Sequence, residues 1–192
     1  AGTSVDGRQP ALENLAMSSV TPQAAPSCRF CGVPLTVTFI DLGSQPLANS
    51  YVPEERLTQT DPVYPLHARV CGACFLVQVD AVVPAEEIFS DYAYFSSYSA
   101  SWVDHARRYA EAMIARFGLN SGSEVIEIAS NDGYLLRHFV AAGIPVLGVE
   151  PAANVAQAAQ ELGVQTHVGF FGAQTARQLK AQGHAADLMT AN

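Results

Sequence analysis

The residues with the clearest chemistry are four cysteines in two Cys-x-x-Cys pairs, Cys28 with Cys31 and Cys71 with Cys74. Two intervening residues let both thiolates of a pair face one ion, and two pairs supply the four sulfurs of a closed tetrahedral zinc site. A redox Cys-x-x-Cys is the alternative, but it usually occurs once, at the start of a helix. We therefore predict a structural Zn²⁺ bound by all four cysteines, with a β insert between the pairs and tight turns permitted by Gly32 and Gly72.

A second group of residues, Glu127-Ile128-Ala129-Ser130-Asn131-Asp132-Gly133, lies between a predicted strand and a predicted helix, where nucleotide-binding Rossmann domains place their glycine-rich turn. A dinucleotide fingerprint needs three glycines, whereas only Gly133 is present. The acidic turn would also repel a pyrophosphate at a helix N-terminus. It suits the sulfonium and ammonium groups of S-adenosylmethionine (SAM) better. Glu150 ends the next predicted strand and can accept hydrogen bonds from ribose hydroxyls.

Alternating strands and helices are expected to position this loop. The predicted strands are 125–129, 145–150, 164–168 and 187–191, and the predicted helices, each ended by a glycine, are 134–142, 152–162 and 173–182. A longer helix is expected from about Ser101 to Phe117. This alternation predicts parallel strands with crossover helices, hence an α/β, Rossmann-like fold. The sheet is expected to be incomplete, because the fourth strand is the last.

The chain before this region divides into three stretches. Residues 1–26 show no sustained period and are predicted to be a disordered tail. Residues 27–85 are predicted to form a small β-rich zinc-binding domain, with strands at 35–40 and 75–79 and a loop-rich stretch at 41–49. Residues 86–192 are assigned to the Rossmann-like domain. It opens with a run of aromatic residues and serines whose Tyr92 and Tyr94 either pack between the domains or contact substrate.

Composition bears on partners and location. The formal net charge is −8, with 18 acidic and 10 basic residues and no basic cluster, so neither nucleic acid nor an anionic membrane is an expected partner. No apolar run reaches the roughly 18–20 residues that cross a bilayer, and the N-terminus does not read as a secretory signal. Paired cysteines without an export signal favour the cytoplasm. Oligomeric state is not indicated.

Four features occur together: the two cysteine pairs, the run Asp41-Leu42-Gly43-x-Gln45-Pro46-Leu47-Ala48-Asn49, the Tyr-x-Tyr-x-Ser-Ser stretch, and Glu127-x-x-x-Asn131-Asp132-Gly133. In this combination the chain resembles the sugar C-methyltransferases, SAM-dependent enzymes with an N-terminal zinc domain. Members of that family act on nucleotide-linked keto-deoxysugars in antibiotic and surface-glycan pathways. The resemblance covers roughly residues 27–192.

The resemblance implies a cofactor site and a substrate side. The residues expected to bind SAM are Glu127, Ala129, Asn131, Asp132, Gly133, Glu150, Phe170, Phe171 and Asn192. Tyr92 and Tyr94 are expected to lie near the substrate, as tentative catalytic residues. Two positions depart from the family: Ala129 stands where glycine is usual, and Gly169 where an acidic residue is often found. The catalytic Glu-His pair of the family lies downstream, so we expect the chain to be C-terminally truncated and its general base to lie beyond residue 192.

Three other functions are compatible with these residues. The first is a non-catalytic zinc-ribbon interaction module with a vestigial Rossmann half. The second is a nicotinamide-dependent oxidoreductase, which the missing glycines disfavour. The third is a methyltransferase that acts on an oxygen or nitrogen atom of another acceptor. The histidines on predicted helices, His105 and His138, are expected to be solvated or packed and not catalytic.

Overall fold

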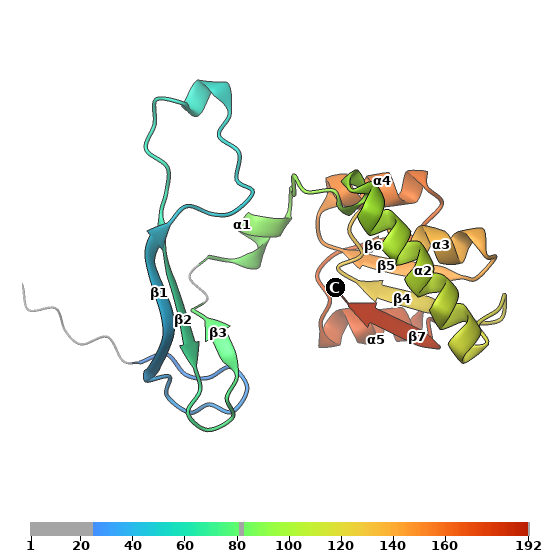
Figure 1. The fold of residues 1–192 in the computed structure, drawn as a ribbon, viewed down its shortest axis with the longest axis horizontal. Helices are drawn as coiled ribbons and strands as arrows, with labels where there is room; N and C mark the ends of the chain where they lie inside the picture. The colour runs from blue at the N-terminus through green and yellow to red at the C-terminus, as the bar shows by residue number, and fades with distance from the viewer. Residues whose placement is uncertain (1–24, 81–82, 192) are drawn as a thin grey trace, which may run out of the picture. The chain divides into compact units, whose positions relative to one another are not determined.

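The computed structural model describes residues 25–80 and 83–191 of the chain (Figure 1). The described residues form two compact units: the first comprises those up to Asp41 together with His67–Asp80, and the second comprises Leu42–Leu66 together with the described residues beyond Asp80. The domain boundary near residue 85 stays a prediction. Most of the predicted tail, residues 1–24, lies outside the described residues.

A three-stranded sheet has the strand order β1-β2-β3. Its strands are β1 (Val37–Gln45), β2 (Tyr64–Val70) and β3 (Val77–Val79), and the short 3-10 helix η1 (Glu54–Arg56) lies between β1 and β2. β2 and β3 are antiparallel, with Val70 opposite Val77. β1 and β2 form the β insert expected between the cysteine pairs. The predicted loop at 41–49 is wrong in its first half, because β1 continues to Gln45; every residue of this strand is exposed, so no alternation of buried and exposed side chains marks it.

The second sheet is parallel, has four strands in the order β6-β5-β4-β7, and confirms the predicted α/β fold class. Its strands are β4 (Val125–Ile128), β5 (Val146–Glu150), β6 (Thr166–Val168) and β7 (Leu188–Ala191), connected by α3 (Leu136–Ala141), α4 (Ala153–Glu161) and α5 (Ala173–Ala181). Across the sheet, the neighbouring strands are the third, second, first and fourth of these strands along the chain. This is the doubly wound arrangement, which places ligands at the carboxyl ends of the strands beside the point where strand order reverses.

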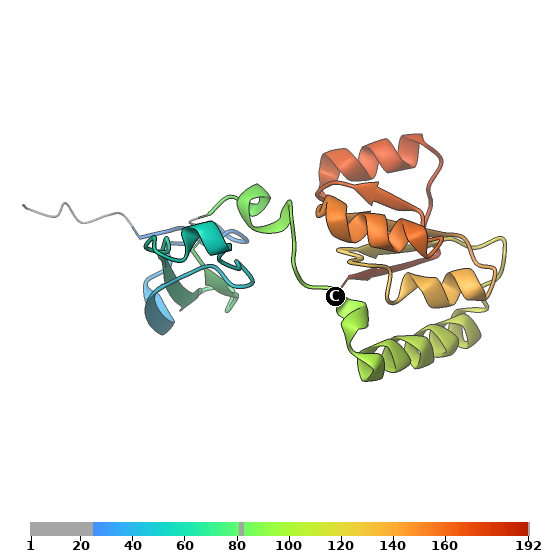
Figure 2. The same cartoon turned by 90° about the horizontal axis from the view of Figure 1, so that it is seen from above.

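Helices cover both faces of this sheet (Figures 1 and 2). α2 (Ala100–Phe117), α3 and α4 lie on one face and α5 lies on the other. Successive side chains of a strand point to opposite faces. Val125 therefore joins the cluster that contains residues of α2 and α3, while Ile126 packs with Leu179 of α5. By the same alternation Glu127 points to the α2 face, where an apolar residue would be expected.

α2 starts close to its predicted position because Ser99 caps it: its hydroxyl accepts a hydrogen bond from the Trp102 backbone amide at 3.3 Å. Gly118, in the left-handed conformation, ends the helix as predicted. Two short elements precede α2: the helix α1 (Ala85–Phe89) and the 3-10 helix η2 (Ser96–Tyr98). Among the described residues, no helix is long and apolar enough to cross a membrane.

Candidate functional site

The four cysteines come together in the first unit, as the sequence predicts. All four are free thiols, and their sulfurs lie within 4.8 Å of one another. Cys28 Sγ is 3.7 Å from Cys74 Sγ, and Cys31 Sγ is 3.5 Å from Cys71 Sγ. Four sulfurs about 2.3 Å from a central zinc ion would be about 3.8 Å apart. The sulfur positions therefore fit a tetrahedral, closed Zn²⁺ site with no open position for catalysis.

The pKa values of the thiols also favour a bound cation between the four sulfurs. The backbone amide of Cys31, and to a lesser extent the Gln78 amide, lower the pKa of Cys28 to about 6 against the effect of burial. At Cys74 the Leu76 amide acts to lower the pKa, but burial and the neighbouring sulfurs raise it to about 12. Sulfurs this close cannot all ionise by themselves, since each thiolate disfavours the next. A bound Zn²⁺ removes that conflict because coordinated thiols are deprotonated.

The two cysteine turns are built alike but use different residues at the same place. Gly32 donates its backbone N–H to the Cys28 carbonyl at 2.8 Å, and Phe75 donates its N–H to the Cys71 carbonyl at 3.0 Å. Both residues are left-handed, with φ of 77° for Gly32 and 63° for Phe75. The role expected of Gly72 is therefore wrong, because Phe75 and not Gly72 takes the strained position.

Gln78, on β3, joins the first cysteine turn to the strand that follows the second. Its side-chain amide donates to Cys28 Sγ at 3.2 Å, and its carbonyl oxygen accepts from the Arg29 backbone N–H at 3.0 Å. The residue is buried, with 8% of its surface exposed. Groups that hydrogen-bond to metal ligands fix their orientation. Sequence reasoning missed Gln78, although a lone glutamine inside an apolar strand was the available signal.

In the second unit a cavity of about 550 Å³, here called the strand-end cavity, opens at the carboxyl ends of β4 and β5. Seven residues predicted for the site line it: Tyr92, Tyr94, Ala129, Asn131, Glu150, Phe170 and Phe171. Ser96 and Tyr134 also line it and were not predicted. Asp132 and Gly133 lie in the adjoining loop without lining it, and Asn192 lies outside the described residues.

The loop after β4 turns sharply, and two residues carry the strain. Ala129 and Asn131 are left-handed, with φ of 57° and 49°. Asparagine tolerates this conformation well, whereas alanine does so at a cost of about 1–2 kcal/mol. Gly133 is required for close packing against α4 and the segment after it, because a Cβ there would lie 3.0 Å from Val164 Cγ2 and 3.2 Å from Ala159 Cβ.

The polar side chains expected to hold the cofactor already have protein partners. Asn131 Oδ1 accepts from the Ser96 backbone N–H at 2.8 Å, and Asp132 Oδ2 accepts from the Ser97 N–H at 3.0 Å. Glu150 accepts from the backbone amides of Asn131 and Ala152, both at 2.9 Å. A carboxylate has about four lone-pair sites, so Glu150 keeps capacity for a ligand hydroxyl while it braces the loop.

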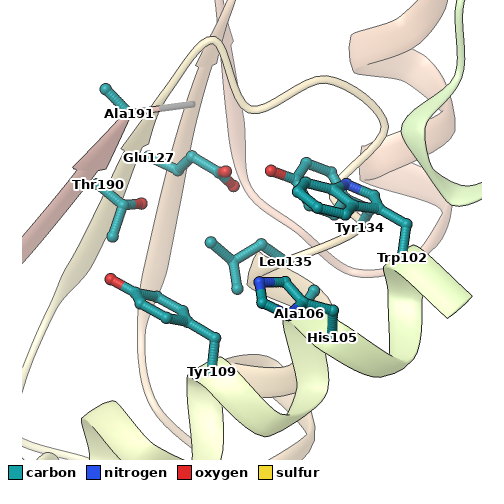
Figure 3. Close-up of a pocket in the computed structure, with 9 residues that line it drawn as sticks. All are labelled: Trp102, His105, Ala106, Tyr109, Glu127, Tyr134, Leu135, Thr190 and Ala191. Carbon is teal, nitrogen blue, oxygen red and sulfur yellow. The ribbon is translucent and has the colours of Figure 1, made fainter.

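A smaller cavity of about 220 Å³, here called the inner cavity, lies under α2 and shares Tyr134 with the strand-end cavity. Figure 3 shows Trp102, His105 and Tyr109 of α2 on one side, Thr190 on the other, and the Glu127 carboxyl turned toward the Tyr134 hydroxyl. Trp102 stacks on Tyr134 with ring centroids 6.0 Å apart. A buried carboxyl surrounded by aromatic rings suits a cationic or hydrogen-bonding group.

Glu127 has none of its surface exposed. Burial raises the pKa of its carboxyl to about 8; the Tyr134 hydroxyl acts to lower it, while the nearby carboxylates of Asp132 and Glu150 raise it further. Three buried acids therefore surround the loop. The carboxylates of Asp132 and Glu150 oppose a pyrophosphate and favour a cation near this loop.

A close approach between neighbouring strands also escaped the sequence analysis. A Cβ on Gly148 of β5 would lie 2.4 Å from Ser130 Oγ. Ser130 is fully buried, so the glycine in β5 leaves the room that the loop after β4 needs. A glycine inside a predicted strand was the available signal.

The fold and the site thus define a Rossmann-like α/β unit with a site at its strand ends beside an acidic loop, preceded by a four-cysteine metal centre. Residues 28–89 match the family described as "Putative zinc binding domain". The chain is also 33% identical over 152 residues to the C-methyltransferase NovU of Streptomyces niveus. The matched stretch covers 79% of this chain and 36% of that protein. These matches confirm the predicted resemblance to C-methyltransferases with an N-terminal zinc-binding domain. The chain spans about a third of the length of this relative.

Two solved structures are more distantly similar. SAM-bound CalS10, an amino pentose methyltransferase from Micromonospora echinaspora involved in calicheamicin biosynthesis, is 22% identical, with 53% of this chain and 44% of that chain covered and a TM-score of 0.37. DesVI of Streptomyces venezuelae is 20% identical, with 35% and 28% covered and a TM-score of 0.30. Likenesses of this size add nothing to the site.

Proposed function

We propose that the chain provides the zinc-binding unit and the cofactor-binding half of a SAM-dependent C-methyltransferase. The observation that carries the proposal is the strand-end cavity, lined by Glu150 and adjoining the acidic loop after β4, in a chain 33% identical over 152 residues to a C-methyltransferase. The acceptor in this proposal is a nucleotide-linked keto-deoxysugar, as the sequence resemblance implies.

In this proposal SAM supplies an activated methyl group, and the residues of this chain bind and orient it. Phe170 and Phe171 line the strand-end cavity and offer apolar surface to an adenine ring. Glu150 accepts hydrogen bonds from the ribose hydroxyls with its remaining lone pairs. A positive charge at the other end of the cofactor would favour ionisation of the buried Glu127 carboxyl, and the carboxylate formed in this way would compensate that charge. Tyr92 and Tyr94 line the same cavity, and in this proposal the acceptor lies beside them.

The same proposal leaves proton abstraction to residues beyond Asn192. The Zn²⁺ site is structural in this scheme, because its four ligands close it. The zinc unit and the strand-end cavity would then have separate roles in one enzyme, with the cytoplasm as its location.

Thermal unfolding in the presence of SAM, S-adenosylhomocysteine (SAH) or NAD tests the proposal. A ligand at 100 times its dissociation constant should stabilise the second unit by about 2.7 kcal/mol. We expect SAM and SAH to do so and NAD to have no effect, and we expect one zinc ion per chain. Phe170→Ala should reduce the shift, whereas the control Phe30→Ala, at an exposed position in the zinc unit, should leave it unchanged. Stabilisation by NAD alone would contradict the proposal.

A zinc-ribbon interaction module is the second candidate. It is favoured by Phe30 and Phe75, which stand on the two cysteine turns with 78% and 76% of their surfaces exposed, since exposed aromatic side chains often mark interaction sites. A folded chain that contains zinc but is not stabilised by SAM or SAH would support this function over the first.

A further inference from the structure

Residues 92–97, here called the strap, are attached to α4 through one asparagine side chain. The Tyr92 backbone N–H donates to Asn154 Oδ1 at 3.2 Å, and Asn154 Nδ2 donates to the Tyr92 carbonyl at 2.8 Å. A side-chain amide offers one acceptor and two donors. Asn154 therefore pairs with the strap as a peptide group of a neighbouring strand would.

The other end of the strap is attached to the loop after β4 in the same way. Asn131 Oδ1 accepts from the Ser96 N–H at 2.8 Å, and Asn131 Nδ2 donates to the Tyr94 carbonyl at 3.1 Å. Asp132 adds a third contact through the Ser97 N–H at 3.0 Å. Both ends of the strap are thus fixed by side chains of the cofactor half.

We infer that Asn154 is a positioning residue that, together with Asn131, holds the strap as a wall of the strand-end cavity. Tyr92, Tyr94 and Ser96 of the strap line that cavity, whereas Asn154 does not. Asn154 acts through the strap backbone and places the two tyrosines without touching a ligand itself.

A purely structural role would require Asn154 to support the packing of α4, and its surroundings argue against this. Asn154 is exposed, next to the first residue of α4, and both hydrogen bonds that its side chain makes in the described structure go to Tyr92. The residues of α4 that pack in the core are its neighbours Val155, Ala156 and Ala159. Removing the Asn154 amide should therefore release the strap and leave the sheet and its helices folded.

Release of the strap has a thermodynamic consequence for any ligand of the cavity. The apparent affinity of a ligand falls in proportion to the fraction of molecules in the competent state. The competent state here is the one in which the strap is attached. If that state is only slightly more stable than the detached one, loss of two neutral hydrogen bonds of ordinary net strength lowers the fraction of molecules with an attached strap by about three- to tenfold. The identity of the ligand rests on the proposed function, while the attachment of the strap does not.

Amide hydrogen exchange and calorimetric titration with SAH, both on the 192-residue chain, test the inference. In Asn154→Ala we expect the Tyr92 amide to exchange about tenfold faster and SAH to bind about three- to tenfold more weakly, with an unchanged unfolding midpoint. Asn154→Asp keeps an acceptor for the Tyr92 N–H, so it should restore protection of that amide. The control is Gln157→Ala, an exposed change on the same helix, which should alter neither quantity.

Either measurement can overturn the inference. Unchanged exchange at Tyr92 in Asn154→Ala would show that the asparagine does not hold the strap. Faster exchange with unchanged SAH affinity would show that the strap is not a functional wall of the cavity. If the wild-type chain does not bind SAH, the proposed function fails, and the exchange of the Tyr92 amide alone decides whether Asn154 positions the strap.

Discussion

The first unit buries an apolar cluster of Cys28, Leu35 and Cys71, with Cys74 packed against it, whereas the four-stranded sheet of the second unit buries apolar side chains on both of its faces. Three of the four residues in the first cluster are the predicted metal ligands, so little apolar surface remains to stabilise that unit. The comparison indicates that metal coordination stabilises the first unit, while burial stabilises the second. Buried acidic groups then concentrate in the second unit, whose core can tolerate them.

Metal removal should reveal the largest difference in stability between the two units. A high-affinity zinc chelator is expected to remove on the order of 10 kcal/mol of coordination free energy, so β1–β3 should unfold while β4–β7 remain folded. Amide exchange measured strand by strand checks this. Equal loss of protection in both sheets, or none in either, would contradict the contrast between the units.

Glu127→Gln should change the pH dependence of the second unit. Between pH 4.5, the ordinary value of the carboxyl, and about pH 8, its value in the folded protein, the unfolded chain is ionised at Glu127 while the folded chain keeps the proton. The free energy of unfolding therefore falls as pH rises through this window. The variant lacks this loss, so its free energy of unfolding relative to wild type should be higher by about 4 kcal/mol at pH 8 and by little near pH 4.5.

Denaturant unfolding followed at several pH values measures this difference. The control is Glu161→Gln, at the exposed end of α4, which should behave as wild type throughout. A constant difference between Glu127→Gln and wild type across the window would mean that the carboxyl is ionised in the folded protein.

Gln78→Ala should weaken metal binding without preventing it. Loss of a group that orients a metal ligand typically reduces metal affinity by about 10- to 100-fold, because Cys28 loses its hydrogen-bond donor. Competition with a coloured chelator measures the affinity, and the absorption of the Co²⁺-loaded protein reports the ligand geometry. Gln59→Ala, an exposed change, is the matched control, and equal affinities in the two variants would remove Gln78 from the metal centre.

Ala129→Gly should produce the smallest change, a stabilisation of about 0.5–1 kcal/mol. Glycine adopts the left-handed conformation of this position (φ 57°) without the steric cost of a Cβ, and part of that gain is offset by greater freedom in the unfolded chain. Denaturant unfolding checks this against Ala112→Gly, in the exposed middle of α2, which should destabilise by about 1 kcal/mol. Destabilisation by Ala129→Gly would mean that the methyl group makes contacts that outweigh the strain.

The sequence predicted the second unit far better than the first. Short apolar runs separated by helices with terminal glycines placed β4–β7 and α3–α5 within about two residues of their observed bounds. In the three-stranded sheet β1 is exposed along its whole length, and the position of β2 was not predicted. An alternation of apolar and polar residues identifies a strand only where one of its faces is buried. A unit stabilised mainly by a metal buries few strand residues, so its sequence lacks this alternation.

The features of the candidate site also divide into those predicted from the sequence and those that only the structure revealed. By themselves, the residue types and spacing determined the four-cysteine centre, the parallel sheet and the acidic loop after β4, because thiolate pairs, alternating elements and strand-helix turns are local in sequence. Only the tertiary structure decided that Asn131 and Asp132 are engaged by the strap, that Asn154 and Gln78 hold other functional groups, and that Glu127 is buried beneath α2. These contacts join residues far apart in the chain, and a hydrogen-bond partner or a raised pKa is a property of the surroundings that folding assembles.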